Sequence, residues 1–281
     1  MQIFLDTADY RAIKDRYETG LVSGITTNPT LVRKSGVDYF DFISRLSRDF
    51  SFESISAEVD GNTADVMLEN AQQYIAIGSE VTIKLPLTKE GLIACRILSE
   101  QGVKTNVTLC FSAAQSVMTA LAGATYISPF VGRMNDNSFS GVELIRAIGG
   151  LYGTKRVETK VLAASLRDVH HVSRCFLYGA DVCTLPTSVF DKMYNHVLTM
   201  QDLLFLKRIL KRLMVELSVA EFEKDFDAYM DRIEAGESFL IRQPDGRAVV
   251  AVPAGEYEAA ATAVAEVDEL TEMYSDHEEG S

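Results

Sequence analysis

The sequence predicts a (β/α)8 TIM barrel, an α/β fold of eight parallel strands inside a ring of helices, followed by a small C-terminal α+β module. Over residues 1–196, short apolar runs alternate with longer amphipathic segments, and the apolar runs number eight. A step in charge predicts the separate module. Residues 216–281 hold 18 of the 40 acidic residues but 4 of the 27 basic ones, so that region carries −14 and residues 1–215 carry +1.

The predicted strands are short runs rich in apolar and β-branched residues, which is typical of parallel strands buried on both faces. They are Gln2–Leu5, Leu21–Ile25, Ser54–Val59, Val81–Leu85, Thr105–Leu109, Tyr126–Phe130, Lys160–Ala163 and Asp181–Leu185.

Helices are predicted between the strands, at Asp9–Glu18, Asp38–Asp49, Thr63–Ile77, Lys89–Gln101, Ser112–Leu121, Gly141–Leu151 and Val169–Tyr178. Thr63 is a suitable N-cap, Gly78 and Gly102 can each end a helix, and Gly123 and Gly179 are suitable points for a return to strand. The alternative fold is a doubly wound open sheet, which has fewer strands and a glycine-rich turn after the first. Here that turn, Asp6–Asp9, contains no glycine.

Composition narrows the class of protein. A chain of 281 residues with 47% hydrophobic and 24% charged residues is typical of a soluble globular protein. It has no apolar run of about 20 residues and no signal-peptide pattern, so we expect a cytoplasmic protein without a membrane partner. The four cysteines form no CxxC pair and no metal-binding spacing with the four histidines, which predicts reduced cysteines and no metal site.

Lys84 is out of place in its strand, because the interior of such a strand seldom keeps an unpaired ammonium group. One explanation is that its stem is buried while the amine reaches solvent. The other is that the desolvated amine has a lowered pKa and acts as a nucleophile.

Polar residues follow or end most of the predicted strands, at the edge where a barrel has its active site. They are Asp6, Thr26, Thr27, Asn28, Glu58, Lys84, Thr108, Arg133, Ser165 and Arg167. Taken singly, Asp6 and Ser165 could be helix caps, and Arg133 could be a solvated loop charge. Their joint placement instead predicts two carboxylates and a lysine at one mouth, with two arginines on the side where barrels usually hold phosphate.

The motifs around these residues resemble those of the small transaldolase and fructose-6-phosphate aldolase family over about residues 1–200. They are Leu5-Asp6-Thr7-Ala8, Gly24-Ile25-Thr26-Thr27-Asn28-Pro29-Thr30, Val81-Thr82-Ile83-Lys84-Leu85-Pro86-Leu87-Thr88, Ser128-Pro129-Phe130-Val131-Gly132-Arg133, Leu162-Ala163-Ala164-Ser165 and Thr184-Leu185-Pro186. That family has a (β/α)8 barrel, in agreement with the strand count.

The resemblance implies roles for the mouth residues. Lys84 would form a Schiff base with a ketose phosphate, Glu58 and Thr108 would manage proton transfer through a water, and Asp6 would be the base for carbon–carbon cleavage. The remaining residues implied to contact a sugar phosphate are Asn28, Thr26, Phe130, Arg133, Ser165 and Arg167. No metal or organic cofactor is expected, because the iminium itself accepts the electrons.

Two positions distinguish the activities within the family. Glu58 stands where the aldolases have glutamine, and Phe130 stands where they have tyrosine, and both choices resemble transaldolases. A glutamate can shuttle protons and a glutamine cannot. The resemblance therefore implies a transaldolase of the pentose phosphate pathway, with an aldolase that releases free dihydroxyacetone as the alternative.

A helix is predicted over Leu198–Leu217, with Leu203, Leu206, Leu210, Leu213 and Leu217 on one face. This face would pack on its own barrel or on a neighbouring subunit. Terminal helices pack on neighbours in the related ring-shaped homo-oligomers, which are pentamers or decamers. We set the end of the barrel domain with its terminal helix at residue 213, so the last residues of the helical pattern fall in the next part of the chain.

Residues 214–274 are expected to form the module, and residues 275–281 a disordered acidic tail. Over about residues 217–260 the sequence resembles a Phd/YefM-type antitoxin, with a hairpin around Pro244-Asp245-Gly246 and a last helix opening at Glu256-Tyr257. Antitoxins of this type bind DNA and a toxin, so a regulatory fusion is an alternative of another class. A region at −14 would be repelled by nucleic acid, which favours protein contact over DNA binding.

Overall fold

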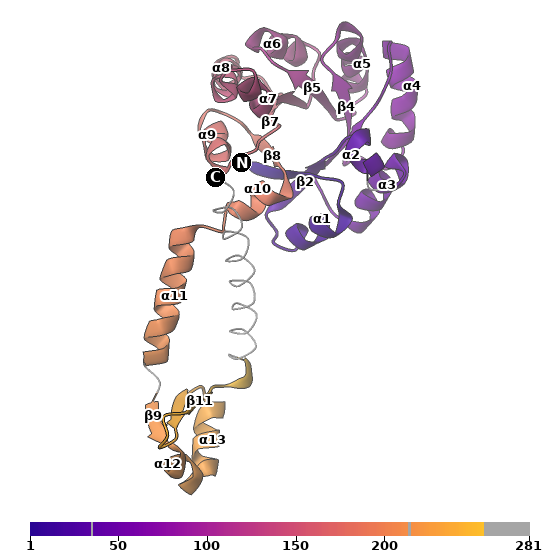
Figure 1. The fold of residues 1–281 in the computed structure, drawn as a ribbon. Coiled ribbons are helices and arrows are strands. Elements are labelled where there is room, and N and C mark those ends of the chain that lie inside the picture. The colour runs from indigo at the N-terminus through magenta and orange to yellow at the C-terminus, as the bar shows by residue number, and fades with distance from the viewer. Residues whose placement is uncertain (35, 213–214, 256–281) are drawn as a thin grey trace. The chain divides into compact units, whose positions relative to one another are not determined.

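The computed structural model describes residues 1–34, 36–212 and 215–255, and it divides the chain after His196 into two compact units (Figure 1). The first unit is a closed barrel in which every strand is parallel to its neighbours and the eighth pairs with the first. The strands are β1 (Gln2–Asp6), β2 (Val22–Thr26), β3 (Ser54–Glu58), β4 (Val81–Pro86), β5 (Thr105–Cys110), β6 (Tyr126–Pro129), β7 (Lys160–Ala163) and β8 (Val182–Leu185). The predicted (β/α)8 barrel is confirmed, and the open doubly wound sheet is wrong because the strands close on themselves.

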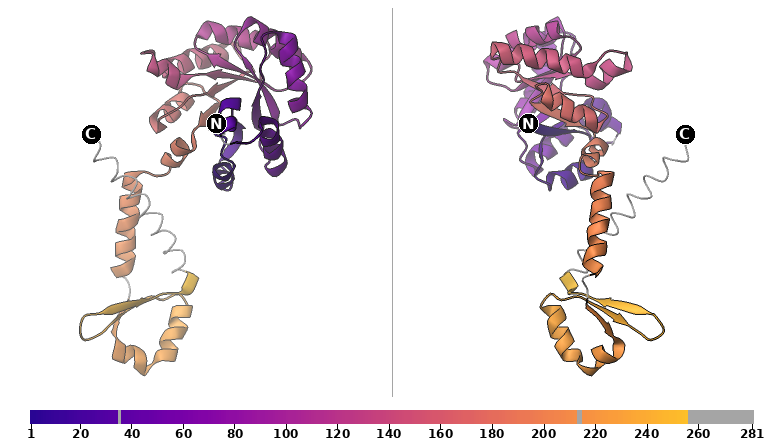
Figure 2. Two further views of the ribbon diagram at one scale, coloured as in Figure 1. Left: turned by 45° about the vertical axis from the view of Figure 1, so that its right-hand side comes forward. Right: turned by 90° about the vertical axis from the view of Figure 1, so that its left-hand side faces the viewer.

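The seven predicted helices are present and surround the strands (Figures 1 and 2). They are α1 (Tyr10–Tyr17), α3 (Tyr39–Asp49), α4 (Ala64–Ile75), α5 (Lys89–Glu100), α6 (Ala113–Leu121), α8 (Gly141–Lys155) and α9 (Val169–Leu177). The Thr63 side chain caps α4 as predicted, by accepting from the backbone N–H of Val66.

Helix α8 extends four residues beyond its predicted end at Leu151. Gly149 within this helix has a packing role: a Cβ at this position would lie 2.4 Å from the backbone oxygen of Tyr178. The extension also buries Tyr152, whose hydroxyl donates to the backbone oxygen of Ser116 at 2.7 Å. The glycine therefore marks a close helix–loop approach inside the helix.

Three short helices were not predicted: α2 (Pro29–Lys34), α7 (Val131–Asp136) and α10 (Thr187–Lys192). Each has six residues, which is too short to display a helical period, and each starts within three residues of a strand end. They therefore lie beside the carboxyl ends of the strands, where a barrel has its active site.

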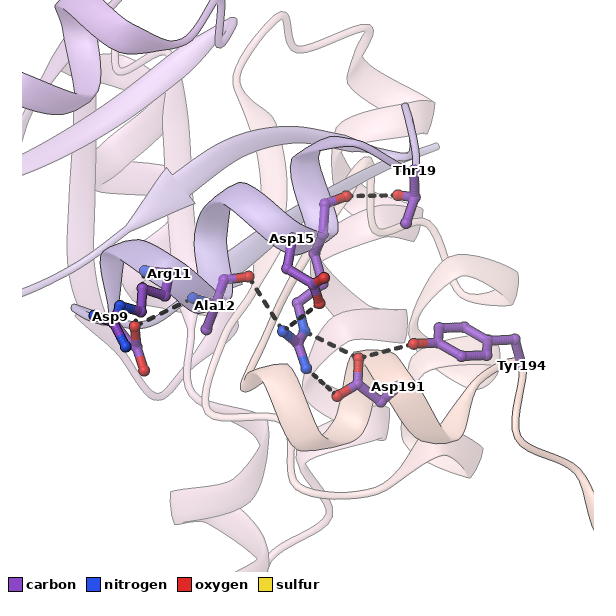
Figure 3. A network of polar contacts seen from close by, with 8 residues as sticks. Asp9, Arg11, Ala12, Asp15, Thr19, Asp191 and Tyr194 are labelled. Carbon is purple, nitrogen blue, oxygen red and sulfur yellow. Dashed lines mark hydrogen bonds and ion pairs between the residues drawn. The ribbon is translucent and has the colours of Figure 1, made fainter. Parts of the chain in front are cut away.

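Helix α10 is tied to α1 by a network of polar contacts, in which Asp191 and Tyr194 are labelled in Figure 3. The Arg16 Nε donates to Asp191 Oδ1 at 3.0 Å, and Nη2 bonds the other carboxylate oxygen. The Tyr194 hydroxyl donates to Asp191 Oδ1 at 3.1 Å. Because α10 follows the last strand and α1 follows the first, this bidentate pair joins the two ends of the barrel sequence.

The barrel contains an apolar cluster and buried polar side chains that bond to each other. The apolar cluster consists of Phe4, Tyr126, Leu162, Ala164 and Val182. The polar side chains include Asn106, which donates to Ser56 Oγ at 3.5 Å and accepts from Ser128 Oγ at 2.7 Å. The barrel interior is thus filled by side chains.

The second unit contains α11 (Val197–Arg212), β9 (Val215–Ser218), α12 (Val219–Lys224), α13 (Phe226–Glu234), β10 (Phe239–Arg242) and β11 (Ala248–Ala251). Its sheet has the order β11-β10-β9, with β10 parallel to β9 and antiparallel to β11. Four buried side chains form its core: Leu217, Ile233, Phe239 and Ile241. The predicted hairpin is confirmed, with Gly246 at a φ of +88° in its turn.

The predicted helix over Leu198–Leu217 is wrong at its end, because Val215–Ser218 is a strand. Alternation explains the difference, since Leu217 is buried against β10 while Glu216 and Ser218 are exposed. The predicted boundary between residues 213 and 214, the last helix opening at Glu256-Tyr257 and the tail at 275–281 lie outside the described residues. Among the described helices, none has the length and apolar character needed to cross a membrane.

Candidate active site

A cavity of about 460 Å³ opens at the carboxyl ends of the barrel strands. Nine of the ten proposed catalytic and substrate-binding residues line it: Asp6, Thr26, Asn28, Glu58, Lys84, Thr108, Phe130, Arg133 and Ser165. Arg167 is the tenth, and it is not part of the lining. The structure therefore brings together side chains from strands or loops throughout the barrel.

Lys84 and Glu58 are partners in the register of β3 and β4, so their side chains leave neighbouring strands on the same face. Lys84 Nζ lies 2.8 Å from Glu58 Oε2 and 3.5 Å from the backbone oxygen of Thr27. Lys84 is 9% exposed, so its amine does not extend into open solvent. Its contacts place the amine inside the cavity with one carboxylate in direct reach.

A hydrogen bond to Tyr39 holds the backbone of Glu58 in place. The backbone N–H of Glu58 donates to the Tyr39 hydroxyl at 2.8 Å. Burial strongly raises the pKa of Tyr39, so the phenol stays neutral beside the carboxylate. The strand end and this contact hold Glu58 at its place next to the amine.

Asp6 is the last residue of β1 and is half-buried in the cavity wall. The Thr26 hydroxyl donates to Asp6 Oδ1 at 3.5 Å and lies 2.6 Å from the hydroxyl of Thr184. Burial raises the pKa of Asp6 above its ordinary value, and the Lys84 amine opposes that rise. A carboxylate of this kind is suited to accepting a proton from a bound molecule.

Thr108 presents a buried hydroxyl to the cavity. Its Oγ1 has no hydrogen-bond partner within the described part of the chain. Buried polar atoms normally have a partner, so a hydroxyl left open at a cavity is suited to bonding a molecule there.

An aromatic wall adjoins the basic side of the mouth. The Phe130 ring contacts Phe111 edge-on at 5.8 Å between centroids, and the Arg133 guanidinium lies 4.8 Å from the Phe130 centroid. Arg133 makes no ion pair with any described carboxylate. Its charge is held over an aromatic face at the edge of the cavity.

Ser165 and Arg167 follow β7. Ser165 lines the cavity with its backbone at a φ of +59°, a conformation rare for residues other than glycine. Arg167 donates through Nη1 and Nη2 to the two carboxylate oxygens of Asp136, each at 2.6 Å. Of the two arginines predicted on the phosphate side of the mouth, Arg133 thus lines the cavity and Arg167 is paired with Asp136, while Ser165 lies in the cavity wall.

Sequence reasoning missed five residues of the cavity wall: Thr30, Leu109, Ser128, Ala164 and Thr184. For two of these residues, the sequence pattern could have predicted a place in the cavity wall. Ser128 and Thr184 come two residues after Tyr126 and Val182 of the interior cluster, so period-two alternation directs them inward near the strand ends. No signal of this kind marks Leu109.

The described residues include no group of three or more His, Cys, Asp and Glu side chains able to hold a metal ion. Cys110 is buried near the mouth, and burial raises the pKa of its thiol to about 11. Of the described groups at the cavity, the candidates for nucleophile and proton transfer are thus Lys84, Glu58 and Asp6.

A closed (β/α)8 barrel with a lysine and two carboxylates at the carboxyl ends of its strands defines a barrel enzyme with a lysine-centred site. The family model described as Transaldolase/Fructose-6-phosphate aldolase matches residues 3–233. The chain belongs to this family and is an aldolase-type enzyme. The match extends further than the predicted resemblance over residues 1–200.

Curated relatives agree with the family. A probable transaldolase of Caulobacter vibrioides (strain NA1000 / CB15N) is 48% identical over 199 residues, which are 71% of this chain and 91% of that protein. One of Methanococcus maripaludis (strain C6 / ATCC BAA-1332) is 41% identical over 232 residues, 83% of this chain and 100% of that protein. One of Geobacillus thermodenitrificans (strain NG80-2) is 43% identical over 203 residues, 72% of this chain and 95% of that protein.

Proposed function

We propose that this protein is a transaldolase of the pentose phosphate pathway. It transfers a dihydroxyacetone unit from a ketose phosphate, such as sedoheptulose 7-phosphate or fructose 6-phosphate, to an aldose phosphate. The observation that carries the proposal is the buried Lys84 amine 2.8 Å from Glu58 in a cavity that Arg133 also lines. An amine in this setting is suited to attack a ketone, and a guanidinium to bind the phosphate of the same molecule.

In the first half-reaction, Lys84 gives a proton to Glu58 and its nitrogen attacks the C2 carbonyl of the donor. Glu58, with a water bonded to Thr108, then protonates the carbinolamine hydroxyl, which leaves as water to give an iminium. Asp6 takes the proton of the C4 hydroxyl. The C3–C4 bond breaks, its electron pair moves towards the iminium, and an aldose phosphate leaves an enamine on Lys84.

In the second half-reaction, the enamine carbon attacks the aldehyde of the acceptor and Asp6 returns its proton to the new hydroxyl. Hydrolysis of the resulting iminium through Glu58 releases the product and restores Lys84. Thr26 and Asn28 are placed to bond donor hydroxyls, and Phe130 forms the wall beside them. Arg133, Ser165 and Arg167 would hold the terminal phosphate.

The alternative within the family is fructose-6-phosphate aldolase, which releases free dihydroxyacetone. Glu58 favours transaldolase, because the aldolases of the family have glutamine at this position, and here a carboxylate that can exchange protons lies 2.8 Å from the Lys84 amine. Phe130, which lines the same cavity, also favours transaldolase, because its ring has no hydroxyl group that could give a proton to the enamine.

Borohydride reduction with fructose 6-phosphate tests the proposal. We expect a stable mass adduct on Lys84 that is absent in Lys84→Ala, and release of free dihydroxyacetone much slower than transfer to glyceraldehyde 3-phosphate. An unmodified Lys84 would rule out both enzyme proposals. An adduct on Lys84 together with fast release of free dihydroxyacetone would exclude the transaldolase and support the aldolase alternative.

For the C-terminal unit we propose a protein-contact module of the Phd/YefM antitoxin type that takes part in forming a homo-oligomer. Supporting this, Leu203, Phe205 and Leu206 of α11 are 46%, 61% and 52% exposed, which is costly for large apolar side chains in water. The test compares the sedimentation coefficient of the unsubstituted full chain with that of the double variant Leu203→Lys/Leu206→Lys. We expect a smaller assembly for the variant. Sequence-specific DNA retardation at low salt would instead favour the regulatory fusion.

A further inference from the structure

The segments that follow β6 and β7 are bonded to each other at the mouth of the barrel. The backbone N–H of Ala164 donates to Pro129 O, that of Val131 to Ala164 O and that of Gly132 to Ser165 O, each at 3.0 Å. These bonds extend the pairing of β6 and β7 beyond the strands. The start of α7 and the residues after β7 therefore form one rigid edge.

Gly132 allows a close approach of the two backbone segments in this edge. A Cβ at position 132 would lie 2.1 Å from the backbone oxygen of Ser165, 2.9 Å from its Oγ and 3.1 Å from Arg167 Nε. The Ser165 hydroxyl and the Nε donor of Arg167 thus border the same position. Only glycine permits this approach, which brings the Ser165 hydroxyl and the Arg167 Nε donor near one point.

Asp136 determines which donors of Arg167 remain available. The Asp136 carboxylate accepts one hydrogen bond from Nη1 and one from Nη2, each at 2.6 Å. The Nε side of the guanidinium stays available for another group, and this side faces Gly132 and Ser165. Asp136 ends α7, the same short helix that carries Arg133 to the cavity. The side chains of Arg167 and Asp136 are 57% and 46% exposed, and exposed ion pairs contribute little to folding stability. The effect of this pair is therefore on the orientation of Arg167.

We propose that Asp136 is a positioning residue for substrate phosphate: it holds Arg167 so that its Nε edge, the Ser165 hydroxyl and Arg133 bind one phosphate group. The inference rests on the proposed function and deepens it. Asp136 touches Arg167 and not the reacting atoms. Its removal should therefore weaken binding of phosphorylated substrates and leave the chemistry at Lys84 unchanged.

The test measures the half-saturating concentration for borohydride trapping on Lys84, with fructose 6-phosphate and with unphosphorylated dihydroxyacetone. Asp136→Asn is expected to raise the value for fructose 6-phosphate about three- to fivefold, within what an exposed ion pair contributes. The value for dihydroxyacetone and the maximal trapping rates stay unchanged. In an Arg167→Ala background, Asp136→Asn should add nothing.

Asp168→Asn is the matched control. It removes the same charge next to Arg167 in sequence, and asparagine can keep the N-cap bond that Asp168 makes to the backbone N–H of His170. Equal changes for both ketones, an equal effect of the control, or tighter fructose 6-phosphate binding in Asp136→Asn would overturn the proposal. Loss of fructose 6-phosphate binding in Arg167→Ala without an effect of Asp136→Asn would also overturn it, while the proposed function stands. Absence of any adduct in the unsubstituted protein is the outcome in which the proposed function itself fails.

Discussion

Replacing Glu58 with glutamine tests the proton transfer that separates transaldolase from aldolase. Glutamine has nearly the same size, and the register that pairs residues 58 and 84 is set by the backbone, so the side chain should keep its position. What changes is that the amide neither accepts a proton from the Lys84 amine nor returns one to the carbinolamine. The substitution therefore removes a proton carrier while preserving the cavity.

The magnitude follows from the exposure of the two partners. General acid–base catalysis contributes about 10²- to 10⁴-fold. The Glu58 side chain is 35% exposed and that of Lys84 is 11% exposed, so water can reach the carboxylate position and replace part of its action. We therefore expect transfer from sedoheptulose 7-phosphate to glyceraldehyde 3-phosphate to slow about 10²-fold, near the lower end of that range. Release of free dihydroxyacetone should rise relative to transfer.

Glu53→Gln is the control, because Glu53 Oε1 makes a similar contact with Lys160 Nζ at 2.9 Å and does not line the cavity. It should leave transfer unchanged. If Glu58→Gln transfers dihydroxyacetone within about threefold of the unsubstituted rate, the role of Glu58 as proton carrier is refuted. Equal losses in the two variants would show that the effect is one of folding.

Further predictions concern the base, the packing and the ends of the barrel. Because Asp6 must be ionised to act and burial raises its pKa, the activity should fall on acidification at a higher pH than an ordinary aspartate would give. Asp6→Asn should abolish turnover. In urea titrations, Gly24→Ala should lower the free energy of unfolding by about 1–3 kcal/mol, since its Cβ would lie 2.7 Å from Phe4 Cε1. Gly150→Ala, with nothing within 4 Å, should raise that free energy by about 0.5–1 kcal/mol. Asp191→Asn should lower it by about 1–2 kcal/mol, because it weakens the fork to the mostly buried Arg16 without touching the cavity.

The barrel could be predicted from the sequence to within one residue at every strand end. Parallel strands covered by helices are buried on both faces, so their apolar runs stand out from the amphipathic segments around them. The helices α2, α7 and α10 could not be predicted, because six residues do not display a helical period. The end of α11 was misplaced because Leu217 fits both a helical face and a strand.

The proposed site residues could be collected from the strand ends because parallel strands in a barrel bring their carboxyl ends to one mouth. Which of them contact each other could not be derived in this way. The position of Arg167 in sequence predicts that it lies near the mouth, but its partner Asp136 comes from a helix that was not predicted. The contact between Lys84 and Glu58 depends on strand register, which the apolar pattern alone leaves undetermined in strands buried on both faces.

Backbone strain gives independent support to the location of the site. Four non-glycine residues of the described chain have a positive φ: Leu109, Ser138, Arg156 and Ser165. Arg156 is an ordinary left-handed helix C-cap, whereas Leu109 and Ser165 line the cavity. Leu109 lies where the β5–β6 register shifts between Val107 and Cys110, directly after the unpartnered Thr108 hydroxyl. Such conformations cost about 1–3 kcal/mol each and persist only when the surroundings enforce them. The barrel enforces two of them at its mouth, where both residues line the cavity.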